Sequence, residues 1–218
     1  LLIWNVPFYI FPVIALSCNI IVVSGNCLNY IKAGNLNTKI LFPYLVGSVP
    51  LAYVGGSLNI EKELFEIFLF LVLFAAGFLL LINFKSYDDK NKSYRKIPTS
   101  LSVLIGSFLG FISGLVGIGG GIFLSPILFL IRAGRPKHIV TAASLFILIN
   151  SISGIVGQLT KNDVLSEIQN YWHLLLVVLI GGQIGNFLNL KIFSSRILAL
   201  VTGFLVLFVA IRMGLRIF

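Results

Sequence analysis

The chain has 218 residues, of which 58% are hydrophobic and only 11% are charged, with a formal net charge of +9. Soluble domains carry roughly 25% charged residues, so this composition excludes an ordinary soluble domain and indicates an integral membrane protein. The Lys and Arg residues sit in short stretches between apolar runs, where such residues set topology and contact lipid headgroups, so the positive charge does not indicate a nucleic-acid partner.

The apolar runs are long and continuous, which favours an all-α, polytopic membrane protein over a β-barrel of alternating segments of roughly 10 residues. In chain order they predict membrane helices at about 10–31, 40–57, 64–84, 139–159, 171–190 and 196–217, with an uncharged segment at about 101–131 before the last three. Residues 85–98 form a long hydrophilic stretch, and we interpret them as a linker between two halves.

A glycine-rich stretch interrupts the uncharged segment. Five glycines fall within eight positions and a proline follows: Gly114, Gly117, Gly119, Gly120, Gly121 and Pro126. Each glycine weakens a helix by about 1 kcal/mol relative to alanine, and proline removes a backbone donor. The apolar flanks place this break at membrane depth, where unpaired backbone is tolerated only when protein buries it or it lines a water-filled cavity. The stretch therefore predicts a broken helix or re-entrant segment, an element that forms substrate sites in secondary transporters.

The two halves of the chain resemble each other, which indicates an internal repeat. Residues 70–76 (FLVLFAA) recur as residues 204–210 (FLVLFVA), with six of seven identical at an offset of 134. At an offset of 129, Pro7 matches Pro136. We therefore divide the chain into a first repeat at 1–84 with three membrane helices, a linker at 85–98, and a second repeat at 99–218. A complete half would hold about four membrane segments, and the glycine-broken helix would open the second half.

The repeat also bears on the start of the chain. Leu1 corresponds to Leu130, so the first half lacks a counterpart of the glycine-rich segment, about thirty residues long. The chain also begins without Met. We expect a chain truncated at its N-terminus, and a natural protein with a single broken helix is the alternative.

Two topologies are open from the sequence. If the glycine-rich segment crosses the membrane once, the repeats are parallel, and Lys and Arg divide about ten to six in favour of the side that holds the linker. If it forms a re-entrant hairpin, the repeats are inverted, and the division becomes about twelve to four. Both place the linker in the cytoplasm by the positive-inside rule.

The pattern Gly114-x-x-Gly117-x-Gly119-Gly120-Gly121, followed by Pro126, resembles the second-half signature of the TauE/SafE family of sulfite exporters and related anion permeases. The following helix, with Thr141-Ala-Ala-Ser144 and Ser151-Ile-Ser-Gly154, is similar to the helix that follows the signature in that family. Two homologous halves and a polar central linker are also typical of the family. The resemblance implies a small anionic substrate, sulfite or an organosulfonate. The expected absence of a first segment would depart from the pattern and would remove half of the presumed symmetric site.

The candidate site residues form two groups. Backbone N–H groups at the start of a half-helix, where the dipole favours anions, would come from Gly117, Gly119, Gly120 and Gly121, with Pro126 fixing the break. Small polar side chains at membrane depth are candidate pathway liners: Ser144, Asn150, Ser151 and Ser153 in the second half, and Asn19, Ser24 and Asn26 in the first. The alternative for both groups is tight helix packing and hydrogen bonding between helices.

No nucleophile–base pair or metal cluster can be assembled from the sequence, so we expect no cofactor and no enzyme activity. Cys18 and Cys27 are nine residues apart on one predicted helix and face opposite ways, which excludes a disulfide or metal pair. No carboxylate or basic residue lies deep in a predicted span, which gives no support to carboxylate-based proton coupling.

Two hypotheses of different classes follow. The first is a secondary permease of the bacterial cytoplasmic (inner) membrane that passes a small anion by alternating access between the repeats, with the lipid bilayer as a partner and a homo-oligomer as a possible state. The second is a non-transporting membrane subunit or scaffold whose glycines serve helix packing only.

Overall fold

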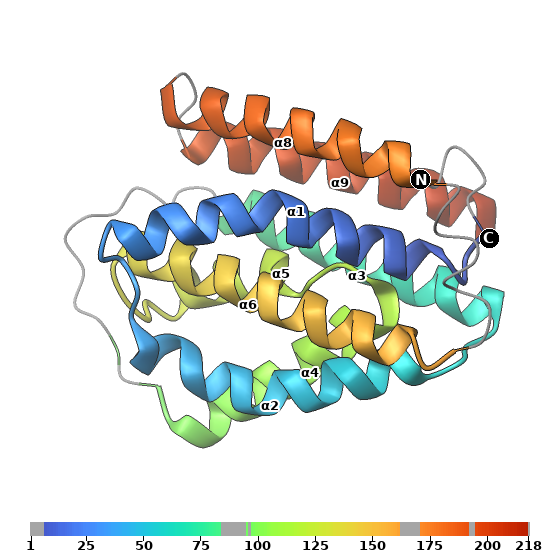
Figure 1. Cartoon of the computed structure of the whole chain (residues 1–218), viewed down its shortest axis with the longest axis horizontal. Helices are drawn as coiled ribbons and strands as arrows, with labels where there is room; N and C mark the ends of the chain where they lie inside the picture. Colours follow the sequence, from blue (N-terminus) through green and yellow to red (C-terminus); the bar gives the residue numbers. More distant parts are fainter. Residues whose placement is uncertain (1–6, 84–94, 96, 162–170, 192–194, 218) are drawn as a thin grey trace.

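The computed structural model describes residues 7–83, 95, 97–161, 171–191 and 195–217, apart from some side chains late in the chain. These residues form helices and loops, without a β-strand: α1 (Phe11–Lys32), α2 (Thr38–Ser57), α3 (Lys62–Asn83), α4 (Thr99–Val116), α5 (Gly121–Leu130), α6 (Pro136–Gln158), α8 (Trp172–Lys191) and α9 (Ser195–Ile217) (Figure 1). Each predicted helix is found within a few residues of its expected bounds. The all-α prediction is confirmed.

Five of these helices are long and apolar enough to cross a membrane, namely α1, α2, α3, α4 and α6. Local sequence sets several of their ends. Pro12 and Pro136 stand in the first turns of α1 and α6, where a missing N–H costs no helical hydrogen bond. Asn37 caps α2, because its Oδ1 accepts the Lys39 backbone N–H at 3.2 Å.

Three helices, α2, α4 and α6, run in the same direction and pack closely through small residues. The backbone of α2 lies against successive glycines of α4, in the pairs Tyr44–Gly106, Ser48–Gly110 and Ala52–Gly114. On the other side, the Ser153 Oγ of α6 donates to the Val49 carbonyl oxygen at 2.6 Å. A Cβ at any of these three α4 glycines would overlap α2 backbone, so the close approach requires glycine.

The glycine-rich segment is a re-entrant hairpin. Since α4 and α6 run in the same direction, the chain between them must return, and α5 is the returning helix. The Arg95 backbone N–H, just before α4, donates to the Arg132 carbonyl oxygen, just after α5, at 3.1 Å. The hairpin thus starts and ends on one face of the bundle. The alternative in which this segment crosses once is excluded by the geometry.

Helices α3 and α9 form an antiparallel pair on one side of this bundle. Phe70 lies against Gly214, and Gly77 lies against Gly203, so residue numbers rise along α3 as they fall along α9. Figure 1 shows α8 and α9 as a layer beside α1 and α3, and Gly182 of α8 packs near Val22 of α1.

Helix directions bear on the predicted repeat. Helices α3 and α9, related by the offset of 134, are antiparallel. Helices α1 and α6, related by the offset of 129, are antiparallel too. Leu16 packs on Gly154, whereas Asn19, later in α1, lies near Gly119 together with Ser151, which is earlier in α6. Opposite directions are expected for inverted repeats. The repeat boundaries stay a prediction, and nearly all of the 85–98 linker lies outside the described residues.

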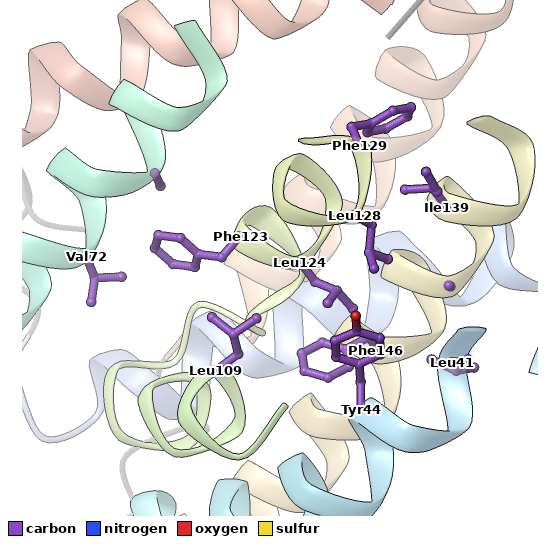
Figure 2. Close-up of a cluster of buried hydrophobic side chains, with 12 residues drawn as sticks. Leu41, Tyr44, Val72, Leu109, Phe123, Leu124, Leu128, Phe129, Ile139 and Phe146 are labelled. Carbon is purple, nitrogen blue, oxygen red and sulfur yellow. The ribbon is translucent and has the colours of Figure 1, made fainter. Parts of the chain in front are cut away.

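The inner face of α5 closes the bundle. Its Phe123, Leu124 and Leu128 side chains are buried in one cluster with Tyr44 of α2 and Phe146 of α6 (Figure 2). Leu124, Leu128 and Phe146 are 0% exposed. This contact holds α5 against α2 and α6 and fixes the position of its first residues, where the glycine break lies.

Candidate functional site

The break between α4 and α5 is made by glycines in left-handed backbone conformations. Gly117 ends α4 with φ 84° and donates its N–H to the Ser113 carbonyl oxygen at 2.9 Å. Gly119 and Gly120 follow with φ 77° and 67°, and α5 begins at Gly121. A residue with a side chain would cost roughly 1–2 kcal/mol at each such position, so the turn itself requires glycine.

Several backbone N–H groups lie close together in the chain at the start of α5. The Gly121 N–H donates to the Gly119 carbonyl oxygen at 2.8 Å, and the N–H groups of Phe123 and Leu124 share the Gly120 carbonyl oxygen. Among the described residues, no acceptor is found for the N–H groups of Gly119, Gly120 and Ile122. A left-handed residue before a helical one aims successive N–H groups into a concave nest, and the positive end of the α5 dipole adds to it. Such a nest can bind an anion.

Small polar side chains surround this nest. The Asn19 Nδ2 of α1 donates to the Gly117 carbonyl oxygen at a long 3.5 Å. A Cβ on Gly119 would lie 2.8 Å from that Nδ2 and 3.3 Å from the Ser151 Oγ of α6. Ser151 and Ser113 are both 0% exposed, and their hydroxyls have no hydrogen-bond partner. An unpaired buried hydroxyl is unusual in a folded protein and suggests a role in holding a ligand.

A cavity of about 990 Å³ opens beside the break, between the bundle and the α3–α9 pair. Its walls are mainly apolar, as in most small-molecule sites. The polar side chains that line it are Asn19, Ser125 and Ser144, and the charged ones are Glu66 and Arg212. The backbone of Gly117 and Gly121 also lines it, so the break faces an open space.

Comparison of the sequence with known proteins identifies the family. The sequence model of the family described as "Sulfite exporter TauE/SafE" matches residues 1–213. The chain belongs to the TauE/SafE family.

Curated relatives of this TauE/SafE protein carry transporter names. The chain is 24% identical to "Probable membrane transporter protein y4hK" of Sinorhizobium fredii, over 88% of the chain and 78% of that protein. It is 23% identical to "Probable membrane transporter protein YunE" of Bacillus subtilis, over 90% and 79%. It is 32% identical to "Probable membrane transporter protein MJ0441" of Methanocaldococcus jannaschii, over 60% and 49%. No solved structure matches the chain.

The family and the apolar helices together make the chain a multi-pass integral membrane protein and a membrane transporter. Its partners are the lipid bilayer and a small-molecule substrate. In the part of the chain that the structure describes, no cluster of three or more His, Cys, Asp or Glu side chains could hold a metal ion, and Cys18 and Cys27 are free.

The structure brings several of the predicted site residues of this TauE/SafE protein together. Those that line the cavity are Gly117, Gly121, Asn19 and Ser144. Gly119 and Gly120 form the break itself, and the Ser151 Oγ lies beside it, 3.3 Å from where a Cβ on Gly119 would be. These seven residues come from α1, α6 and the hairpin, and α1 is remote in sequence from the other two.

Other predicted residues lie elsewhere. Ser153 is bonded to α2, as described above, and Ser24 donates within α1 to the Ile21 carbonyl oxygen at 3.1 Å. The Asn150 Nδ2 donates to the Phe146 carbonyl oxygen at 2.8 Å, while its buried Oδ1 has no partner. Asn26 is half-buried further along α1. None of these four lines the cavity.

Pro126 does not fix the break, contrary to the sequence interpretation. It is buried inside α5, five residues after the helix begins, and the chain turns at Gly117, Gly119 and Gly120 instead. The reason is local. A helix can pass through one proline by giving up a single hydrogen bond, whereas left-handed glycines change the direction of the chain.

Sequence reasoning missed the two charged residues of the cavity, Glu66 and Arg212. Each lies within the first or last turns of its helix, so both looked like ordinary end charges. A usable signal was present in α9. Leu205, Val209 and Arg212 fall on one helical face, and all three line the cavity.

A buried polar contact supports the tip of the hairpin. Gln158, at the end of α6, is 0% exposed, and its Nε2 donates to the Gly114 carbonyl oxygen at 3.0 Å. The Lys161 Nζ donates in turn to the Gln158 Oε1 at 2.9 Å. Burial lowers the pKa of Lys161 from its ordinary 10.5 to about 8. The contact joins α6 to α4 three residues before the break.

Proposed function

We propose that this transporter is a secondary permease that moves a small anion, sulfite or an organosulfonate, across the cytoplasmic membrane. The observation that carries the proposal is the glycine break, where unpaired N–H groups lie near the unpartnered Ser151 hydroxyl and where Gly117 and Gly121 line a cavity. Neutral donors at a helix start favour an anion without placing a buried positive charge against it. The sulfur-containing substrate is supported by the description of the family.

The arrangement of the helices supports alternating access. Helices α3 and α9 form a pair that packs on α4 and α5 through buried residues such as Leu69 and Val72 and borders the cavity elsewhere. Small residues fuse α2, α4 and α6 into one body. A rocking motion of one body against the other would expose the break to each side in turn. Antiparallel directions of the offset-related helices fit an inverted pair of repeats.

Charge distribution supports a cytoplasmic linker. With the hairpin returning to its own face, Lys and Arg divide about twelve to four in favour of the face that holds Arg95 and Arg132. An excess of this size marks the cytoplasmic side of a membrane protein. We therefore propose that residues 85–98 lie in the cytoplasm.

A scaffold without transport is the competing hypothesis, and the packing of α4 on α2 favours it in part. Gly106, Gly110 and Gly114 are explained by that packing alone. Gly119 and Gly120 are different, because their left-handed conformation creates a turn beside a cavity. A scaffold has no need for such a turn.

Anion flux in proteoliposomes tests the proposal. Sulfite, thiosulfate, sulfoacetate and chloride would be compared for wild type and two serine variants that lie two residues apart on α6. Ser151→Ala removes a hydroxyl beside the break, and we expect flux to fall about tenfold while stability is unchanged or rises by about 1 kcal/mol.

The matched control is Ser153→Ala, which loses the hydrogen bond to Val49. It should destabilise the protein by about 1 kcal/mol and leave flux within about twofold. Saturable sulfite or sulfonate flux with this pattern supports the permease. Absence of flux for every anion, from folded and inserted protein, would leave the scaffold hypothesis in its place.

A further inference from the structure

The cavity carries one feature that the glycine break does not explain, its pair of charged side chains. Among the described residues that line it, Glu66 of α3 and Arg212 of α9 are the ionisable ones. Both belong to the α3–α9 pair, opposite the break. A charged side chain on the wall of a cavity attracts or repels an ionic ligand in that cavity according to its sign.

The side of α9 that carries Arg212 is the side that faces the cavity. The lining residues of α9 recur at helical spacing, and they include Leu205, Val209, Arg212 and Met213. On α3, Glu66, Leu69 and Leu73 form the corresponding stripe. Arg212 therefore belongs to a wall of the cavity, near the end of α9.

The two charges differ in what surrounds them. Glu66 has a cation on its own helix, since its Oε1 lies 3.9 Å from the Lys62 Nζ. Within the described residues Arg212 forms no ion pair, and its side chain is exposed. A guanidinium offers a planar fork of donors that matches two oxygen atoms of a sulfite, sulfonate or carboxylate group. Arg212 is thus available to a ligand, whereas Glu66 is partly neutralised.

We propose that Arg212 binds the oxyanion group of the substrate in this cavity and is a main determinant of anion affinity. The inference rests on the proposed function and adds a residue to it. Glu66 opposes the same anion through its charge. The glycine break and Arg212 would then form two binding positions along one path, the break next to the bundle and Arg212 near the membrane face where α9 ends.

An oxyanion group could reach Arg212 from two sources, a substrate in the cavity or the phosphate of a lipid headgroup at the membrane surface. Arginine near a helix end often contacts headgroups. The two sources differ in one measurable respect. If Arg212 binds lipid, sulfite uptake by wild type would depend on the anionic lipid content of the vesicle. If Arg212 binds substrate, its contribution to uptake would depend on the substrate concentration.

The test is sulfite uptake into proteoliposomes, with KM and maximal rate measured separately for each variant. Arg212→Gln should raise KM about ten- to a hundredfold, as expected for the loss of charge-assisted hydrogen bonds. Arg212→Lys should restore part of the affinity, and Glu66→Gln should lower KM. Arg132→Gln, which removes an exposed arginine away from the cavity, is the matched control and should leave KM within about twofold of wild type.

Each outcome has a defined meaning. Wild type that transports no anion overturns the proposed function, and the role of Arg212 with it. Wild type that transports sulfite while Arg212→Gln keeps its KM overturns the role of Arg212 alone. A KM effect that is present in vesicles with anionic lipid and absent in zwitterionic vesicles assigns Arg212 to lipid and also overturns the proposal.

Discussion

Substitution of alanine for Gly119 measures how far the break depends on its backbone conformation and how far on the space around it. Gly119 has φ 77°, which costs an alanine roughly 1–2 kcal/mol. The added Cβ would lie 2.8 Å from the Asn19 Nδ2, 2.9 Å from the Ile147 Cγ2 and 3.3 Å from the Ser151 Oγ. Overpacking of this kind adds about 1–3 kcal/mol. We therefore expect Gly119→Ala to destabilise the protein by about 2–5 kcal/mol.

Gly34 is a matched control for the backbone contribution. It has nearly the same φ, 70°, and a Cβ there would meet nothing within 4 Å. Gly34→Ala should therefore cost only the conformational part, about 1–2 kcal/mol. The difference between the destabilisation caused by Gly119→Ala and that caused by Gly34→Ala measures the cost of steric crowding at the break.

Unfolding of the protein in mixed micelles, titrated with a denaturing detergent, measures both free energies. Anion flux gives a second measurement. The methyl group that Gly119→Ala adds would occupy space beside Ser151 and should abolish transport, while Gly34→Ala should preserve transport. Equal destabilisation by the two variants would refute the reasoning, since it would show that the space around Gly119 is not restricted.

Two further predictions concern the packing around the hairpin. Gly114→Ala should destabilise the protein by about 1–3 kcal/mol, because its Cβ would overlap the Ala52 carbonyl oxygen. Gly181→Ala in α8, where nothing lies within 4 Å, should instead be neutral or stabilising by up to about 1 kcal/mol, and equal effects would contradict the close packing of α4 on α2. The pKa of Lys161 near 8 is below its ordinary 10.5, so folding disfavours the charged form, and the cost is present below pH 8 and relieved as pH rises toward 10.5. Melting temperature should thus rise between pH 8 and pH 10 in wild type and much less in Lys161→Met, whereas an identical rise in both would assign it to other groups.

Local patterns in the sequence are sufficient for much of this fold. A membrane helix must satisfy its own backbone and present apolar side chains, so continuous hydropathy predicts where each helix lies without knowledge of its neighbours. The cluster of glycines likewise predicts where the helix breaks, because glycine weakens a helix wherever it occurs. Membrane location, helix bounds and the place of the break were therefore available from the sequence by itself.

The directions of the helices and the contacts of the individual side chains were decided only by the tertiary structure. Whether α5 continues across or returns depends on its contact with α2 and α6, and loop charges were compatible with both. The sequence alone does not distinguish Ser151 from Ser153. In the structure Ser151 faces the break and Ser153 is hydrogen-bonded to α2, because residues two positions apart on a helix are rotated by about 200°. Arg212 and Glu66 meet one cavity only because α9 packs against α3. Such relations join residues far apart in the chain, and local physical chemistry does not encode them.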